Sequence, residues 1–185
     1  MRMRKVLDGL YRFSGGMAAL SLVGIVVIVF GQVVLNVVDF VALSLFNKSF
    51  GLLIPSYASL SGYALGFATF LSLGLGFRQT THIRVTLLES KLAAPVRRST
   101  LTIIALIGVV MGALFTYGLG QLAYQSLMWG DRASGLLRVP LWIPQAVLCV
   151  GAGVFLIAAI DTLVDMLRQG RSEALRIESA AEEAL

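Results

Sequence analysis

The sequence predicts an all-α membrane protein with four transmembrane helices, and three observations support this fold class. Of the 185 residues, 57% are hydrophobic and only 14% are charged, whereas charged residues make up about a quarter of an ordinary soluble domain. The fifteen basic residues lie in short clusters between apolar runs, a pattern that indicates membrane topology rather than nucleic-acid binding. Four long stretches contain no Asp, Glu, Lys or Arg, namely 14–38, 49–77, 99–130 and 139–160.

We expect one span inside each stretch, because a bilayer core of about 30 Å requires about 20 apolar residues per helix. The expected spans are 16–38, 57–77, 101–124 and 141–161. The second and third stretches are longer than this minimum, so they require tilt, a helix that projects from the bilayer, or an interfacial segment such as 50–55. Together the spans form one transmembrane domain, 1–167, followed by a polar tail, 168–185.

The loops differ in their basic residues, and this difference predicts the orientation. Four basic residues lie in 1–12, five in 78–100 and three in the tail, against one in loop 39–56 and two in loop 131–138. Excess positive charge stays on the cytoplasmic side of a membrane. We therefore expect both termini and the middle loop in the cytoplasm. The apolar run after residue 12 is too long for a signal-peptide core, so it should remain as the first span.

Segment 84–96 in the middle loop predicts a short amphipathic helix in the membrane interface. Its basic face would meet anionic lipid headgroups. A solvated connector is the alternative interpretation. The apolar face consists of Val85, Leu88, Leu92 and Val96.

The four charge-free stretches contain no Asp, Glu, Lys, Arg or His that could bind and release a coupling proton, which weighs against a self-sufficient proton-coupled carrier. The chain has one histidine, His82, and one cysteine, Cys149. A membrane cytochrome b needs paired axial histidines, and a quinone-linked disulfide oxidase needs cysteine pairs. We therefore expect no enzyme activity, no catalytic residue, no cofactor and no metal site.

Uncharged polar residues recur inside the spans at helical spacing. Such groups tend to face protein rather than lipid. Two interpretations stay open: hydrogen bonding between helices, or the lining of a substrate path. The candidates for intramembrane polar packing are Gln32, Asn36, Tyr117, Gln121 and Gln145.

Small residues form stripes on two spans. Glycine at four-residue spacing lets helix backbones approach closely, so each stripe predicts tight packing against another helix of this chain or of another subunit. The stripe on the second span is Ala58, Gly62 and Gly66. The stripe on the third is Gly108, Gly112, Thr116 and Gly120.

One short motif follows the second span, and another begins the fourth. The first reads His82-Ile83-Arg84-Val85. The second reads Pro140-Leu141-Trp142. Both resemble motifs of the small membrane subunit of tripartite ATP-independent periplasmic (TRAP) transporters, the DctQ type. The order of a basic N-terminus, four spans, an amphipathic segment after the second span and a Pro/Trp turn into the last is similar as well.

The resemblance implies a non-catalytic scaffold subunit in the bacterial inner membrane. Its implied partners are a large multi-span permease subunit, a periplasmic solute-binding protein and membrane lipids, and the implied process is uptake of an organic acid driven by an ion gradient. The sequence departs from the family pattern at Thr86, where an Asp often stands, and at the uncharged run 56–59. Thr86 and the entry Ile54-Pro55-Ser56-Tyr57 are closer to the branch of the family associated with keto acids and related organic acids.

The motif regions also supply candidate contacts with a partner subunit or with lipid. Snorkelling cations and interfacial aromatic residues anchor helices at the same positions, so simple anchoring is the alternative. The candidates are Arg78, His82, Arg84, Arg138, Pro140 and Trp142.

A second function class is a stand-alone four-helix membrane protein, either an assembly factor or a homo-oligomeric channel. Its pore would use Gln32, Asn36 and Gln121. The small subunit of the related tricarboxylate transporter class shares the four-span plan but is not expected to carry both motifs. Neighbouring reading frames for a secreted solute-binding protein and a large permease would favour the TRAP subunit.

Overall fold

The computed structural model describes residues 2–48, 50–78, 94–134 and 136–169. These residues form four helices and no β-strand, apart from one isolated bridge pair between Arg132 and Pro140. All four helices are long and apolar enough to cross a membrane, which confirms the predicted fold class. The helices are α1 (Arg2–Phe46), α2 (Tyr57–Arg78), α4 (Ala94–Trp129) and α5 (Trp142–Gln169).

The helix α1 is much longer than its predicted span, and the prediction of a loop from residue 39 is wrong. The helix continues through 40–46, which is apolar and lacks Gly and Pro. Asp39 does not end it, because its carboxylate accepts hydrogen bonds from the backbone N–H groups of Phe50 and Gly51. The helix ends only before Asn47, whose φ of 50° is the left-handed conformation typical of a residue just past a helix.

The other helices also extend beyond the predicted spans. Helix α4 begins at Ala94 and ends before Gly130, whose φ of 68° closes the helix in the same way. Helix α5 runs to Gln169, past the predicted domain boundary at 167, and that boundary stays a prediction. Most of the predicted interfacial helix, 84–93, lies outside the described residues, and its last residues, 94–96, belong to α4.

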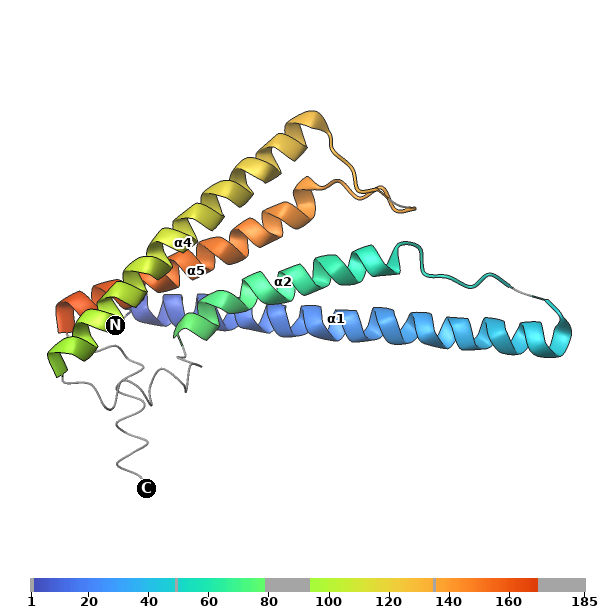
Figure 1. Cartoon of the computed structure of the whole chain (residues 1–185), viewed down its shortest axis with the longest axis horizontal. Coiled ribbons are helices and arrows are strands. Elements are labelled where there is room, and N and C mark those ends of the chain that lie inside the picture. The colour runs from blue at the N-terminus through green and yellow to red at the C-terminus, as the bar shows by residue number, and fades with distance from the viewer. Residues whose placement is uncertain (1, 49, 79–93, 135, 170–185) are drawn as a thin grey trace, which may run out of the picture.

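The helices pack in the order α1, α2, α5, α4, so that α2 and α5 form the middle of the row. Figure 1 shows α1 beside α2 and α4 beside α5, as two pairs that meet at one end and diverge toward the other. The beginnings of α1 and α4 and the ends of α2 and α5 lie at the converging end. The orientation of this end in the membrane stays a prediction.

Small residues bring α2 and α5 into backbone contact near the converging end. Several buried positions of α5 are alanines, such as Ala152 and Ala158. A Cβ atom at Gly151 would lie 2.7 Å from the carbonyl carbon of Phe70, and one at Gly74 would lie 2.7 Å from a methyl group of Val154. Only glycine permits helix backbones to approach this closely.

The predicted small-residue stripe on the third span packs against α5 of the same chain. Cβ atoms at Gly108 and Gly112 would touch Ala159 and Leu156 of α5, and Gly120 faces Cys149. The stripe on α2 is only partly used in this way.

In the small-residue stripe on α2, Gly66 faces Leu148 of α5, whereas nothing lies within 4 Å of a Cβ built at Gly62. Gly62 is also exposed, so this position of the stripe does not pack against another described helix.

We expect Gly151→Ala to destabilise the protein by about 1–3 kcal/mol, because the new methyl group would overlap the Phe70 backbone and force α2 and α5 apart. Gly153→Ala is the matched control, since a Cβ there meets nothing within 4 Å. Unfolding by SDS titration in detergent micelles measures the stability of both variants. Equal midpoints for the two variants would contradict the close contact.

Candidate functional site

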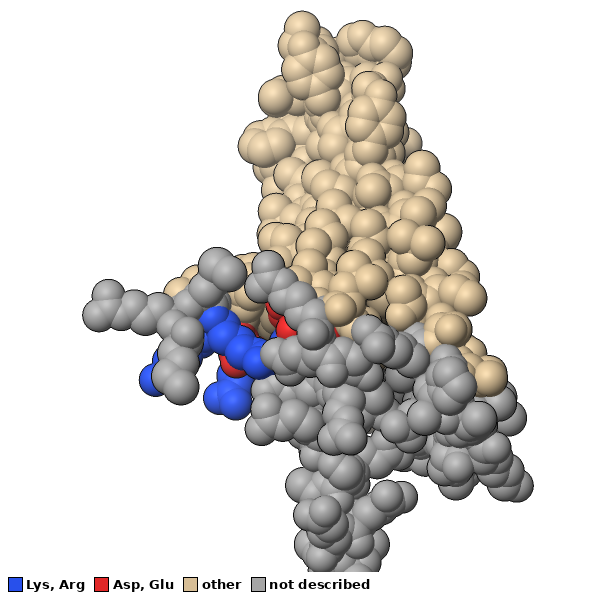
Figure 2. Space-filling view, turned by 90° about the vertical axis from the view of Figure 1, so that its left-hand side faces the viewer, with Lys and Arg blue, Asp and Glu red and all other residues tan. Residues whose placement is uncertain are grey.

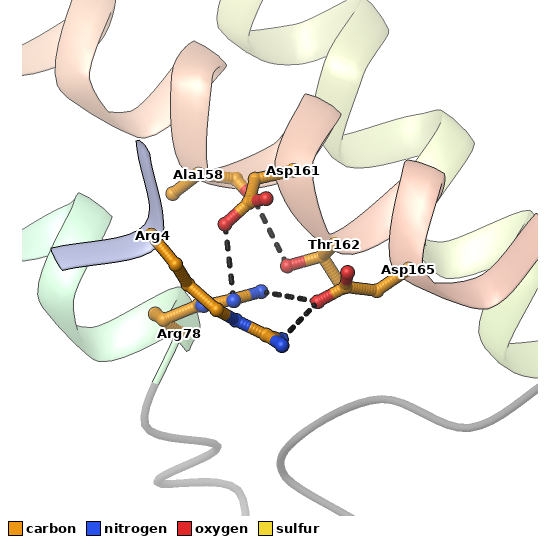
Figure 3. Close-up of polar contacts among 6 residues, drawn as sticks. All are labelled: Arg4, Arg78, Ala158, Asp161, Thr162 and Asp165. Carbon is orange, nitrogen blue, oxygen red and sulfur yellow. Dashed lines mark hydrogen bonds and ion pairs between the residues drawn. The ribbon is translucent and has the colours of Figure 1, made fainter. Parts of the chain in front are cut away.

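Four charged side chains from three helices form an ion-pair cluster at the converging end (Figure 3). Arg78, the last residue of α2, lies 3.0 Å from Asp161 and 3.1 Å from Asp165, which are one turn apart on α5. Arg4 of α1 also donates to Asp165, at 3.0 Å. The cluster therefore joins α1, α2 and α5.

Burial makes this pairing necessary. The side chain of Arg78 is only 9% exposed, and those of Asp161 and Asp165 are 19% and 14% exposed. A charge withdrawn from water is costly unless it is paired. The two arginines and two aspartates carry formal charges that sum to zero, so the cluster is neutral as a unit.

Arginine suits the central position, because its planar guanidinium presents several N–H donors in a fixed fork. Arg78 uses two different nitrogens for the two carboxylates. Figure 2 views the molecule from this end and shows positive and negative side chains in contact, beneath a tall surface without charged residues.

The start of α1 packs against the interior next to the cluster. Tyr11 is 1% exposed and packs with Val154 and Ala158 of α5. Ser14, which is also buried, donates a hydrogen bond of 2.6 Å to the carbonyl oxygen of Leu71 in α2. These contacts fix the helix that presents Arg4.

The sequence predicts Arg78 as a contact with lipid or a partner subunit, whereas the structure buries it in an intrachain ion pair. The acidic partners are missed because they lie over 80 residues away in the chain. One signal could have found them: Asp161 and Asp165 have one-turn spacing at the same membrane end as Arg78. The neighbouring candidates His82 and Arg84 lie outside the described residues.

A second polar site lies near the other end of α1. Gln32 is 3% exposed; its amide oxygen accepts from the N–H of Ile54 at 2.8 Å, and its nitrogen donates to Asn36 at 2.8 Å. Gln32 and Asp39 thus accept hydrogen bonds from N–H groups of segment 50–54, which is not helical. Backbone donors away from water require such partners.

Gln145 joins α5 to α4. With its amide nitrogen directed toward α4, it donates to the Ser126 hydroxyl at 2.8 Å and to the carbonyl oxygen of Leu122 at 3.1 Å. Tyr117 and Gln121 behave differently. Gln121 donates to the Tyr117 hydroxyl at 2.9 Å within α4, and both side chains are exposed.

The motif that begins the fourth span lies at the diverging end, in a loop held by its own backbone. The N–H of Leu141 donates to Asp131 and that of Ala133 to Val139. Arg138 is exposed, Pro140 is partly buried, and Trp142 is 39% exposed as the first residue of α5. One further bond links this loop to the start of α2: the N–H of Leu137 donates to the Ser56 hydroxyl at 3.2 Å.

Neither polar site has the composition of a metal site. Within the described ranges, no group of three or more His, Cys, Asp or Glu side chains could hold a metal ion. The carboxylates of Asp161 and Asp165 are occupied by arginine. The arrangement therefore serves to hold helices together at defined positions.

Comparison with known families gives one match. The model described as "Tripartite ATP-independent periplasmic transporters, DctQ component" matches residues 25–169, which is more than half of the chain. The matched range includes α2, α4, α5 and the second part of α1, from residue 25 onward. Comparison with the curated proteins and with the solved structures gives no match.

We expect Arg78→Met to destabilise the protein by about 3 kcal/mol or more, because it leaves Asp161 without its ion-pair partner in a poorly hydrated site. The double variant Arg78→Met with Asp161→Leu should recover most of this loss, since Arg4 still pairs with Asp165. Arg12→Met, which removes an exposed charge outside the cluster, is the control.

SDS titration in micelles measures the free energy of unfolding for all three. A double variant as unstable as Arg78→Met would contradict a neutral, charge-paired cluster.

Proposed function

We propose a role for this chain on the premise that it belongs to the DctQ component family of tripartite ATP-independent periplasmic transporters. It is the small membrane subunit of such a transporter and crosses the membrane several times. Its proposed role is that of a non-catalytic scaffold for a large permease subunit. That subunit would bind an organic acid and the coupling ion, and a periplasmic solute-binding protein would deliver the acid.

The observation that carries the scaffold role is how little of each span this chain covers by itself. Within the most apolar part of each helix, only 11% of α1, 17% of α2 and of α4, and 28% of α5 is buried inside the chain. The remaining surface must meet lipid or another protein. A row of helices with two wide faces gives a broad membrane footprint, which suits the stationary part of a transporter that moves one domain against the bilayer.

The buried polar groups support the same role. Arg4, Arg78 and the two carboxylates neutralise one another, and Gln32 is occupied by the backbone of Ile54 and by Asn36. Polar groups that hold helices and loops together are not available to bind and release a substrate or an ion. Substrate and ion binding are therefore assigned to the large subunit.

The proposed location is the bacterial inner membrane, with both termini in the cytoplasm. The distribution of basic residues supports this orientation. The ion-pair cluster would then lie on the cytoplasmic side, and segments 47–56 and 130–141 would lie in the periplasm. Because Leu137 bonds to Ser56, these two segments would form one continuous surface toward the solute-binding protein.

The alternative of a homo-oligomeric channel is less well supported. Its pore would use Gln32, Asn36 and Gln121, but Gln32 is buried at 3% exposure and bonded within the chain.

We expect the tagged chain, purified in mild detergent from native membranes, to carry a large multi-span membrane protein in stoichiometric amount. Mass spectrometry identifies it. We also expect uptake of the transported acid to stop when this subunit is deleted while the large subunit remains in the membrane. Recovery of the chain alone, or uptake that persists without it, would exclude the scaffold role.

We expect fusion of green fluorescent protein to either terminus to give fluorescent cells, and fusion of alkaline phosphatase there to give inactive enzyme. The physical reason is that the basic segments remain in the cytoplasm. Alkaline phosphatase inserted after Ser134, in the opposite loop, is the control and should be active. The reverse pattern would invert the proposed orientation.

A further inference from the structure

The outer face of α4 carries a stripe of polar and aromatic side chains that α5 does not cover. This outer stripe consists of Tyr117, Gln121 and Tyr124, with Gln125 beside it. Tyr117 is 69% and Tyr124 62% exposed, and both glutamines are exposed. At about 100° per residue, the stripe lies on the opposite side of α4 from Gly108 and Gly112, which pack against α5. It therefore points away from the rest of the chain.

The outer stripe has unused hydrogen-bonding capacity. Gln121 donates once, to the Tyr117 hydroxyl, which leaves a second N–H and the amide oxygen. The part of the chain that the structure describes offers no hydrogen bond to the side chains of Tyr124 or Gln125. Several hydroxyls elsewhere on the spans do not have this need, because they bond to their own helix, as Thr69 does to the carbonyl of Leu65.

The depth of the outer stripe along the span makes its unused hydrogen-bonding groups costly. Trp129 ends α4 and is 76% exposed, as expected of an aromatic residue at the membrane interface. At 1.5 Å per residue, Gln121 lies about 12 Å and Tyr117 about 18 Å from Trp129 along the helix. Half of the hydrocarbon core is about 15 Å. With Trp129 at the interface, Gln121 would lie deep in the hydrocarbon core, where lipid tails offer no hydrogen bonds.

We infer that the outer stripe of α4 is the docking face for a transmembrane helix of the large permease subunit. This inference rests on the proposed function. The partner helix would present hydrogen-bonding side chains opposite Gln121, and small residues where Tyr117 and Tyr124 project.

Lipid suits other faces better. Exposed positions in the middle of α1, such as Val26, Phe30 and Val33, are apolar.

A second copy of this chain fits the outer stripe less well than a different helix does. Two copies related by an axis along the membrane normal would cross where equal residues meet. A crossing at Gln121 would set Tyr117 against Tyr117 and Tyr124 against Tyr124. Two such pairs of large side chains would hold the helices too far apart for a bond between the glutamines. A helix with small residues at these levels provides the matching grooves.

Photo-crosslinking tests the inference in the full complex. A p-benzoylphenylalanine at position 121 should crosslink to the large subunit when both subunits are co-expressed in membranes. The first control is position 122, an exposed leucine at the same depth on the flank of α4. The second is position 27, an exposed valine on α1. The yield at 121 should exceed the yield at both controls.

Three results would overturn the inference while the large subunit still co-purifies: an adduct of two copies of this chain, no protein adduct at 121, or an equal yield at 121 and 27. Failure of the large subunit to co-purify with the unmodified chain would instead overturn the proposed function.

Substitution gives an independent readout. Gln121→Leu replaces the amide with an apolar side chain of similar size and keeps a good helix former at this position. It should weaken association with the large subunit by between about three-fold and 30-fold. Thr69→Val, at an exposed hydroxyl that bonds its own helix, should leave association unchanged. Equal affinities for Gln121→Leu and the unmodified chain would contradict a hydrogen-bonded docking face.

Discussion

Arg78 and the two carboxylates of α5 hold the converging end of this molecule, and the rest of the arrangement depends on that contact. In a poorly hydrated environment, each of these charges is tolerated only in the presence of the others. The pairing therefore fixes where α2 ends relative to α5, and Arg4 adds the start of α1 to the same point. Glycine contacts then continue the packing along the spans, as at Gly151 and Gly74.

Different polar interactions hold the two ends of the molecule together. Charged side chains join helices at the converging end. At the diverging end, neutral amides and one aspartate bond to the backbone of loops, as Gln32 does to Ile54 and Asp39 to Phe50. The middle of each span relies on small and apolar residues. This division explains how a chain with few charged residues defines both the spacing of its helices and the path of its loops.

The number of spans could be predicted because the thickness of the hydrocarbon core sets a length that an apolar run either reaches or does not. Helix ends were less predictable. Asp39 looks like a boundary in the sequence, yet its bonds to the next loop let α1 continue to Phe46. The ion-pair cluster and the partial use of the α2 glycine stripe depend on which helices are neighbours, and spacing along one helix does not contain that information.

The length of α1 couples this subunit to the lipid around it. Its 45 residues span about 67 Å, roughly twice the hydrocarbon core, so the helix must tilt steeply or extend well outside the bilayer. Its far end holds segment 50–54 through Gln32 and Asp39. A change in bilayer thickness alters the tilt of such a helix, and with it the height of that segment above the membrane. The lipid composition of the membrane would thereby influence the position of segment 50–54 and of the surface around it.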